Sequence, residues 1–186
     1  MSRINYNHDF VERFVVGTVG PPGDRSFFLQ IQSPTYSNCV AVEKSQVAAL
    51  SERFKEMIRE LRRNKIASLD ELALSSSLEN HEMEFPITED FRVGIIGISW
   101  DIDRQRIDLE IQAISDEDIE ELISGENGDN DDLPDVINAP LRIFQVRNFC
   151  VLADALISAG RQPCPFCGLP IDPEGHLCPR SNGYRR

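Results

Sequence analysis

The chain has 186 residues, of which 41% are hydrophobic and 27% charged, proportions that suit one globular domain with or without a small appendage. No apolar run approaches the roughly 20 residues of a transmembrane helix, and the N-terminal M-S-R-I-N-Y-N-H-D-F has no apolar signal region. Five cysteines, an odd number, argue against a disulfide framework. These totals favour a cytoplasmic protein and argue against a membrane-spanning or disulfide-stapled secreted one.

The first half of the chain is predicted to form three strands and a helix. Arg13–Val19 and Ser26–Gln32 are rich in β-branched and aromatic residues, and the G-P-P-G-D-R between them favours a hairpin over a phosphate-binding loop. Cys39–Glu43 is a short third strand. A helix follows from Ser45, its expected cap, to about Asn64. Its apolar residues recur at three- and four-residue intervals and form a stripe to be buried: Val47, Leu50, Phe54, Met57, Ile58 and Leu61.

The second half is predicted to contain further strands and a second helix. Residues 66–81 could form a short helix followed by a polar loop. Strands are expected near Glu82–Ile87, Phe91–Trp100, Ile107–Ile114 and Leu141–Val146. The second helix is expected over Asn148–Ala159, with Gly160 following its end.

One acidic segment between the last two predicted strands accounts for most of the net charge of −12. Ten acids and no base lie between Ser115 and Asp135, which leaves 21 acids against 19 bases in the rest of the chain. Like charges at this density cannot bury a core, so residues 115–135 are predicted to be flexible, with a transiently helical first part and a disordered G-E-N-G-D-N-D-D. The charge disfavours non-specific contact with nucleic acid nearby.

The two halves share a weak internal similarity. F-V-V-G-T-V-G at Phe14–Gly20 resembles F-R-V-G-I-I-G at Phe91–Gly97, and the strands that follow contain L-Q-I-Q and L-E-I-Q. The pattern indicates two β-β-β-α units, produced either by duplication or by chance strand periodicity. We therefore expect an α+β fold over residues 1–160, with antiparallel strands in one or two sheets and two packed helices. Residues 161–186 form a separate tail.

The tail has the most specific chemistry of the chain. Cys164, Cys167, His176 and Cys178 follow the spacing C-x2-C-x8-H-x-C and supply the four ligands of a closed tetrahedral Zn²⁺ site. Gly168 allows a tight turn that points amide groups at the sulfurs. His176 and Cys178 project from one face if their segment is extended. We interpret the four residues as a structural zinc knuckle, since a catalytic zinc would keep one position open.

Two alternatives for the tail remain open. A metal-free turn or a redox C-x-x-C is possible, but a redox pair should open a helix, which Pro165, Pro170 and Pro173 disfavour. The tail could instead touch nucleic acid through Phe166 and Tyr184, because its bases outnumber its acids by two. Those bases and acids are Arg161, Arg180, Arg185 and Arg186 against Asp172 and Glu174. A docked structural tail is the simpler reading, since two net charges are few for phosphate binding.

The other candidate residues have plain interpretations. Cys39 and Cys150 lie in apolar patterns and are predicted to be buried thiols, although a nucleophilic Cys–His pair with His8 or His81 stays open. Four arginines could converge on an anion, which a sequence alone cannot show: Arg3, Arg13, Arg25 and Arg92. No catalytic residue is assigned.

Three stretches together resemble a known family. They are F-V-V-G-T-V-G-P-P-G near the start, F-R-V-G near the middle, and C-P-F-C-G…D-P-E-G-H-L-C-P-R-S-N-G-Y-R-R at the end. In these, the chain resembles domain-of-unknown-function family 3090, a cytoplasmic bacterial family seen mainly in actinobacteria. The resemblance implies that the metal-ligand block belongs to the family pattern, and it carries over no catalytic residue.

The function predicted from these observations is a non-enzymatic, cytoplasmic, zinc-stabilised protein that binds another macromolecule, with a protein as the expected partner. An enzyme with a pocket between sheet and helices is one alternative. A nucleic-acid-binding protein that uses the basic tail is another.

Overall fold

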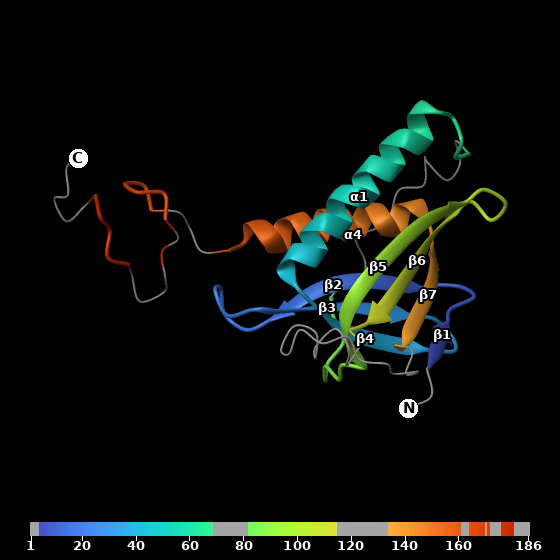
Figure 1. The fold of residues 1–186 in the computed structure, drawn as a ribbon, viewed down its shortest axis with the longest axis horizontal. Helices are drawn as coiled ribbons and strands as arrows, with labels where there is room; N and C mark the ends of the chain where they lie inside the picture. The colour runs from blue at the N-terminus through green and yellow to red at the C-terminus, as the bar shows by residue number, and fades with distance from the viewer. Residues whose placement is uncertain are drawn as a thin grey trace, which may run out of the picture.

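The computed structural model describes residues 4–68, 82–114, 134–160, 164–169, 171 and 176–180. Within these residues, a seven-stranded sheet and two helices form the predicted α+β fold (Figure 1). The predictions for residues 69–81 and 115–133 lie outside the described residues. None of the described helices is both long and apolar enough to cross a membrane.

The first unit consists of β2 (Arg13–Val19), β3 (Ser26–Gln32), β4 (Ser37–Val42) and α1 (Lys44–Arg63). The β2–β3 hairpin is confirmed, and Gly20 and Gly23 in its turn have φ angles of 103° and 102°, which glycine adopts without steric cost. The prediction that Ser45 caps α1 is wrong. The helix starts directly after β4, with Glu43 as its N-cap; the Glu43 amide donates to Oε1 of Gln46 at 2.9 Å. The predicted apolar stripe is buried, except that Met57 is only partly so.

The second unit consists of β5 (Phe91–Asp101), β6 (Arg106–Ala113), β7 (Val136–Leu141) and α4 (Ile143–Ser158). The predicted strand Leu141–Val146 is wrong, because α4 begins five residues before the expected Asn148. Its first three turns bury apolar residues at helical spacing: Ile143, Val146, Phe149, Cys150 and Ala153. The chain therefore contains two successive β-β-β-α units, as predicted.

The strand order β1-β7-β6-β5-β4-β3-β2 places the two units side by side. Each unit is an antiparallel meander, and the units meet where β4 and β5 pair in parallel, Val40 opposite Phe91 and Ala41 opposite Arg92. β1 (Asn5–Asn7), which the sequence analysis missed, adds a parallel strand beside β7. The hydrogen-bond ladder between β1 and β7 ends at residue 140. The next amide donor of β7 would be this residue, which is a proline without an N–H.

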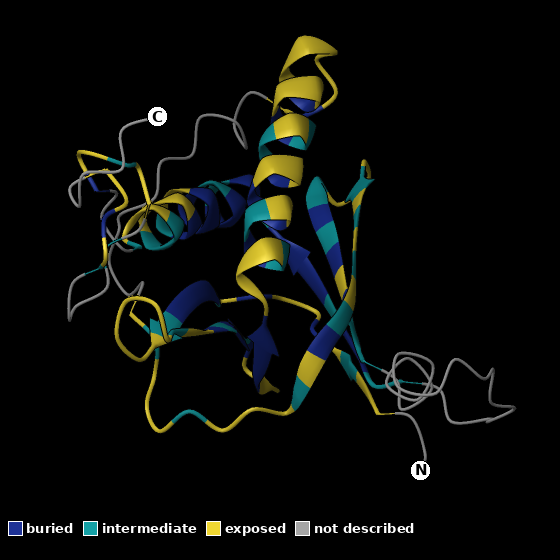
Figure 2. Cartoon of the chain, turned by 60° about the vertical axis from the view of Figure 1, so that its left-hand side comes forward, coloured by how far each residue is buried: buried dark blue, intermediate teal, exposed yellow. Residues whose placement is uncertain are grey.

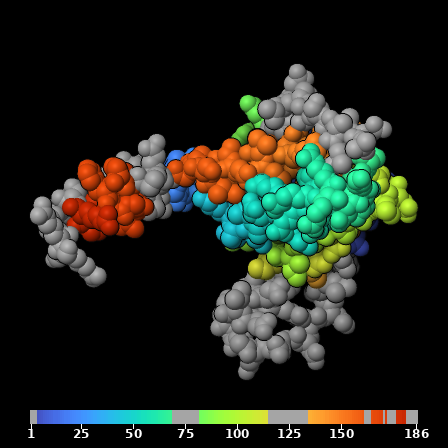
Figure 3. Space-filling model, turned by 90° about the horizontal axis from the view of Figure 1, so that it is seen from above, coloured from blue at the N-terminus to red at the C-terminus, as the bar shows by residue number. Residues whose placement is uncertain are grey.

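Both helices cover the same face of the sheet, and they lie side by side (Figures 1 and 3). Three phenylalanines fill the space between them and β2: the Phe14 and Phe149 rings stack at 4.9 Å, and Phe54 meets Phe149 edge-on at 5.5 Å. All three are buried (Figure 2 shows the buried layer). Asp154 of α4 joins the helices by accepting hydrogen bonds from Ser51 and Lys55 of α1, at 3.0 Å and 2.8 Å.

The third residue of each helix is a glutamine whose side chain donates hydrogen bonds to the backbone of the other unit. Gln46 of α1 donates to the carbonyls of Val93 and Gly94 in β5, at 3.2 Å and 3.1 Å. Gln145 of α4 donates to the carbonyl of Val11, just before β2, at 2.8 Å. Each helix is thus fixed to the start of the opposite unit, and the arrangement of the two units is reciprocal.

Residues 82–90, which we call the cover segment, lie over the sheet face opposite the helices in the first unit. The predicted strand Glu82–Ile87 is wrong, because this segment is held by side chains rather than by a strand ladder. The Gln30 side chain accepts a hydrogen bond from the Glu84 amide at 2.8 Å and donates to the Glu84 carbonyl at 2.9 Å. The Met83 side chain lies against Gly17, where a Cβ would collide with it.

Candidate metal centre

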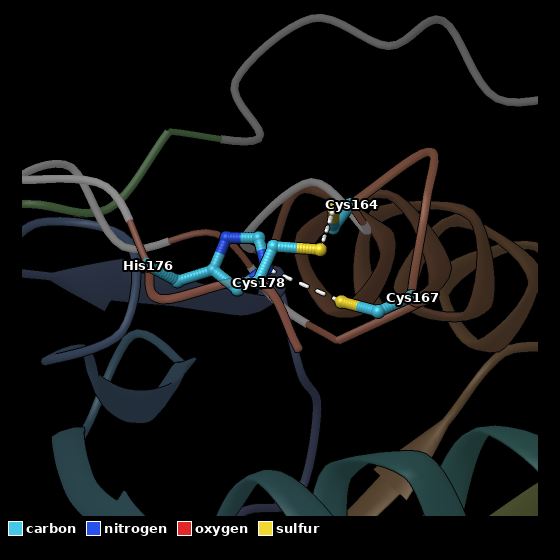
Figure 4. A group of neighbouring side chains, drawn as sticks. All are labelled: Cys164, Cys167, His176 and Cys178. Atoms are coloured by element: carbon cyan, nitrogen blue, oxygen red, sulfur yellow. Dashed lines mark hydrogen bonds between the residues drawn. The ribbon is translucent and has the colours of Figure 1, made fainter. Parts of the chain in front are cut away.

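The four predicted ligands come together in the tail that follows α4. One ligand atom from each of Cys164, Cys167, His176 and Cys178 lies within 4.8 Å of all the others (Figure 4). The cluster lies beyond the C-terminal end of α4, away from the sheet (Figures 1 and 3). Cys164 and Cys178 are buried within the tail, and Cys167 and His176 are half-buried.

The Cys164–Leu169 segment closes on itself as a tight turn. The Cys164 amide donates to the Leu169 carbonyl at 2.7 Å, and the Gly168 amide donates to the Cys164 carbonyl at 2.8 Å. Gly168 has a φ of 77°, the left-handed region that disfavours residues with a Cβ. The Phe166 amide points at Sγ of Cys164, 3.4 Å away. This turn is the one the sequence predicted, with an amide directed at a sulfur.

The second pair of ligands, two residues apart, closes the cluster. Nε2 of His176 lies 3.2 Å from Sγ of Cys167, and Sγ of Cys178 lies 3.7 Å from Sγ of Cys164. Two thiolates bound tetrahedrally at about 2.3 Å from one zinc ion would be about 3.8 Å apart, close to this sulfur–sulfur distance. A disulfide would need about 2.05 Å. All the cysteines are free.

The two cysteines of the C-x2-C pair have opposite pKa shifts. Burial opposes ionisation of Cys164, but hydrogen bonds from the Cys167 and Phe166 amides outweigh burial and lower its pKa below the ordinary thiol value. Burial and the neighbouring thiolates raise the pKa of Cys167. A bound cation would offset this repulsion and favour the ionised thiolates. Three sulfurs and one imidazole nitrogen thus fit a metal ion with four protein ligands.

Three apolar side chains close to the ligands in the sequence are exposed to solvent. Phe166, Leu169 and Leu177 are 63%, 50% and 87% exposed, and we call these three residues the knuckle patch. Each is within two residues of a ligand in the sequence. Arg180 donates to the Phe166 carbonyl at 3.1 Å and so links the two arms of the tail. Metal binding would therefore also fix the position of the knuckle patch.

Comparison with known proteins agrees with the resemblance seen in the sequence. Residues 6–178 match the family described as "Protein of unknown function (DUF3090)". The chain belongs to the DUF3090 family. The match includes all four cluster residues and ends at Cys178. No curated protein and no solved structure matches the chain.

Cys39 and Cys150 of this DUF3090 chain are buried thiols, as predicted, and burial raises the pKa of both. Sγ of Cys150 points at the Ser51 carbonyl. The His8 ring bonds to Asn38 rather than to a thiol, and His81 lies outside the described residues. The open possibility of a nucleophilic Cys–His pair therefore has no support among the described residues.

The three candidate arginines among the described residues contact different protein groups. Arg13 pairs with Glu84 at 3.2 Å, and Arg92 lies 4.0 Å from Glu43. Arg25 donates to the Ala159 carbonyl at 3.2 Å, at the C-terminal end of α4, where positive charge is favourable. Arg3 lies outside the described residues.

A buried polar chain that the sequence did not reveal joins β1 to β4. Nδ2 of Asn38 donates to Asp90 at 3.0 Å, so Oδ1 of Asn38 faces Nε2 of His8, also at 3.0 Å. Because that oxygen only accepts, Nε2 of His8 carries the proton. Nδ1 is buried and has no hydrogen-bond partner among the described residues. Burial lowers the pKa of His8, against the opposing effect of the bond to Asn38.

Proposed function

We propose that this DUF3090 protein is a cytoplasmic, non-enzymatic, zinc-stabilised module whose tail binds a protein partner. In this proposal residues 1–160 form the body, residues 115–135 within it are flexible, and residues 161–186 form the zinc-knuckle tail. The convergence of Cys164, Cys167, His176 and Cys178 beside the exposed knuckle patch carries the proposal.

The donor set supports zinc as the ion. Three thiolates and one imidazole suit Zn²⁺ better than Mg²⁺ or Ca²⁺, which prefer oxygen ligands. Four protein ligands leave no open position for a substrate, so the ion's role is structural. A short segment with no core of its own gains its order from the metal.

The knuckle patch supports a partner. Side chains as large as Phe166 and Leu177 cost free energy when they face water, and a fixed apolar cluster is a common anchor in protein interfaces. An exposed aromatic ring can also stack on a nucleobase, so nucleic acid is the second candidate. The net charge of −12 disfavours that candidate.

The enzyme alternative requires a pocket with reactive groups between sheet and helices. The structure has a cleft of about 280 Å³ between α1 and β5. It is lined by Gln46, Ala49, Leu50, Arg53, Gly94, Ile96 and Ile98. Arg53 is the single titratable side chain in that lining, whereas acid–base or nucleophilic catalysis needs at least two cooperating groups. The lining favours a binding module.

Capture of partners from the native cell tests the proposal. The double variant Phe166→Ser, Leu177→Ser should keep its zinc but lose the partner that the wild-type chain retains. Val151→Ser is a matched control, because Val151 is an apolar residue of α4 that is 60% exposed. It should retain the partner. Equal recovery with all three proteins would contradict the role of the knuckle patch, and loss of recovery after nuclease treatment would identify nucleic acid instead.

A further inference from the structure

The sheet faces that point away from the helices carry equivalent rows of residues in the two units. If L-Q-I-Q of β3 is matched to L-E-I-Q of β6, Gln30 corresponds to Glu110 and Phe28 to Asp108. The strand registers then define two pairs of matching rows. The first matching pair consists of the row Val15, Gln30 and Cys39 in the first unit and the row Gly97, Glu110 and Asn138 in the second. The second pair consists of the row Gly17, Phe28 and Ala41 and the row Ser99, Asp108 and Pro140.

In the first unit, these rows bind an extended piece of chain, the cover segment. The Gln30 side chain makes two hydrogen bonds with the backbone of Glu84, and Met83 occupies the space above Gly17. Arg13 at the edge pairs with the Glu84 carboxylate at 3.2 Å. The fold therefore contains one example of how this sheet face holds an extended peptide: a polar side chain on the middle strand, a small residue beneath, and a charged residue at the edge.

In the second unit, the matching rows form the floor of a groove of about 540 Å³. Gly97 and Ser99 in its floor are exposed. A Cβ on Gly97 would meet only Cβ of Glu110, at an ordinary 3.8 Å, so the space above it is open among the described residues. Asn7 and Asn138, joined by a hydrogen bond of 2.9 Å, form the wall next to β1. We call this the outer groove.

The outer groove is acidic. Asp9, Asp108 and Glu110 line it, against a single base, Arg104. Arg104 is already engaged, since its guanidinium bonds Asp108 at 2.9 Å and Asp101 at 2.7 Å. This excess of negative charge attracts a cationic ligand.

An exposed apolar residue lies on β5 beyond the lining of the outer groove, two residues before Gly97. Ile95 points outward from β5, opposite Gln112, and is 63% exposed. Gln112 also donates to the Glu110 carboxylate at 2.7 Å and holds it in place. Ile95 occupies the position that corresponds to Arg13 in the first unit. An extended ligand would therefore meet carboxylates along the groove and an apolar residue beyond it.

We propose that the outer groove binds an extended peptide segment of a partner protein that carries a lysine or arginine. The segment would lie across the second unit as the cover segment lies across the first. Its cationic side chain would pair with Glu110, and an apolar side chain would contact Ile95. The area is separate from the knuckle patch, so a partner could engage the protein at two points.

Synthetic octapeptides with blocked ends test this proposal directly. A positional library, with lysine, glutamate or alanine fixed at each position in turn, is titrated against the full zinc-loaded chain by fluorescence anisotropy. We expect selection of lysine over glutamate at one position, by at least tenfold in Kd. Gly97→Val, whose Cβ would meet only Cβ of Glu110 at an ordinary 3.8 Å, should abolish binding, and Glu110→Gln should weaken it about tenfold.

Glu60→Lys, an exposed change on α1 that adds positive charge away from the groove, is the control and should leave Kd within twofold. The urea midpoint of each variant shows that it is folded. Absence of lysine selection, or affinity unchanged in folded Gly97→Val, would overturn the proposal. An effect of Glu60→Lys as large as that of Glu110→Gln would also overturn the proposal, because the net charge of the protein alone would then explain the attraction. The cluster variant Cys178→Ser should still bind the peptide, which separates this site from the proposed knuckle function.

Discussion

Replacement of Gln30 by leucine should detach the cover segment from the first unit. The leucine side chain has no hydrogen-bonding group, so both hydrogen bonds to the Glu84 backbone are lost. At roughly 1 kcal/mol for each neutral hydrogen bond, the variant should lose about 2 kcal/mol of stability. For a body of this size, that corresponds to a fall in the melting temperature of about 4–8 °C. Urea denaturation measures the loss, and hydrogen exchange at the Glu84 amide locates it.

Gln32→Leu is the matched control. Gln32 lies two residues away on the same strand and face, and its side chain makes no hydrogen bond to a described residue. This variant should change stability by less than about 0.5 kcal/mol, as surface substitutions usually do. If Gln30→Leu is no more destabilising than Gln32→Leu, and exchange at Glu84 is unchanged, the cover segment is not held by the Gln30 side chain. The comparison between the two sheet faces would then lose its basis.

Three further predictions concern pH, a helix end and the tail. Burial lowers the pKa of His8 in the folded protein, so its contribution to stability is complete above the ordinary histidine pKa of about 6.5 and is lost as the pH falls towards the folded value. His8→Gln should therefore flatten the fall in the urea midpoint between pH 7.5 and 5.5. An unchanged slope would exclude His8 as the cause. Arg25→Ala should lower the free energy of unfolding, measured by urea denaturation, by about 1 kcal/mol, because it frees the last carbonyls of α4. Arg92→Ala loses only an exposed contact and should lower it by less than about 0.5 kcal/mol. Equal losses would refute the capping role of Arg25. Gly168→Ala should weaken zinc binding roughly tenfold in chelator competition, because alanine at this positive φ adds a strain of about 1–2 kcal/mol. Gly97→Ala, the control, should leave the zinc affinity unchanged. Equal affinities of the two variants would show that the turn relaxes without cost.

The metal cluster could be predicted from the sequence because its ligands are close together in the chain. The C-x2-C spacing and the His-x-Cys spacing each constrain two ligands locally, and only one turn is needed to unite them. The hairpin, α1 and the β-β-β-α order were also local patterns of turn residues and apolar periodicity. Their boundaries shifted by a few residues where a strand runs directly into a helix, as at Glu43.

The errors came where the structure depends on a distant partner. β1 has only three residues, too few for a recognisable strand pattern, and it is a strand because β7 lies beside it. β7 contains Pro140, which normally argues against a strand, but this proline lies just where the β1 ladder ends. Glu82–Ile87 looks like a strand in the sequence, yet the backbone of Glu84 is hydrogen-bonded by the Gln30 side chain. The outer groove combines residues of four strands and becomes visible only once their registers are known.

Elemental analysis of protein purified without an affinity tag tests the central claim, a structural zinc in the tail. We predict one zinc per chain, lost in Cys164→Ser and Cys178→Ser and retained in Cys39→Ser, and released by acid because the ligating thiolates become protonated. No zinc in freshly prepared, reduced wild-type protein, with all three tail thiols freely reactive, would contradict the account.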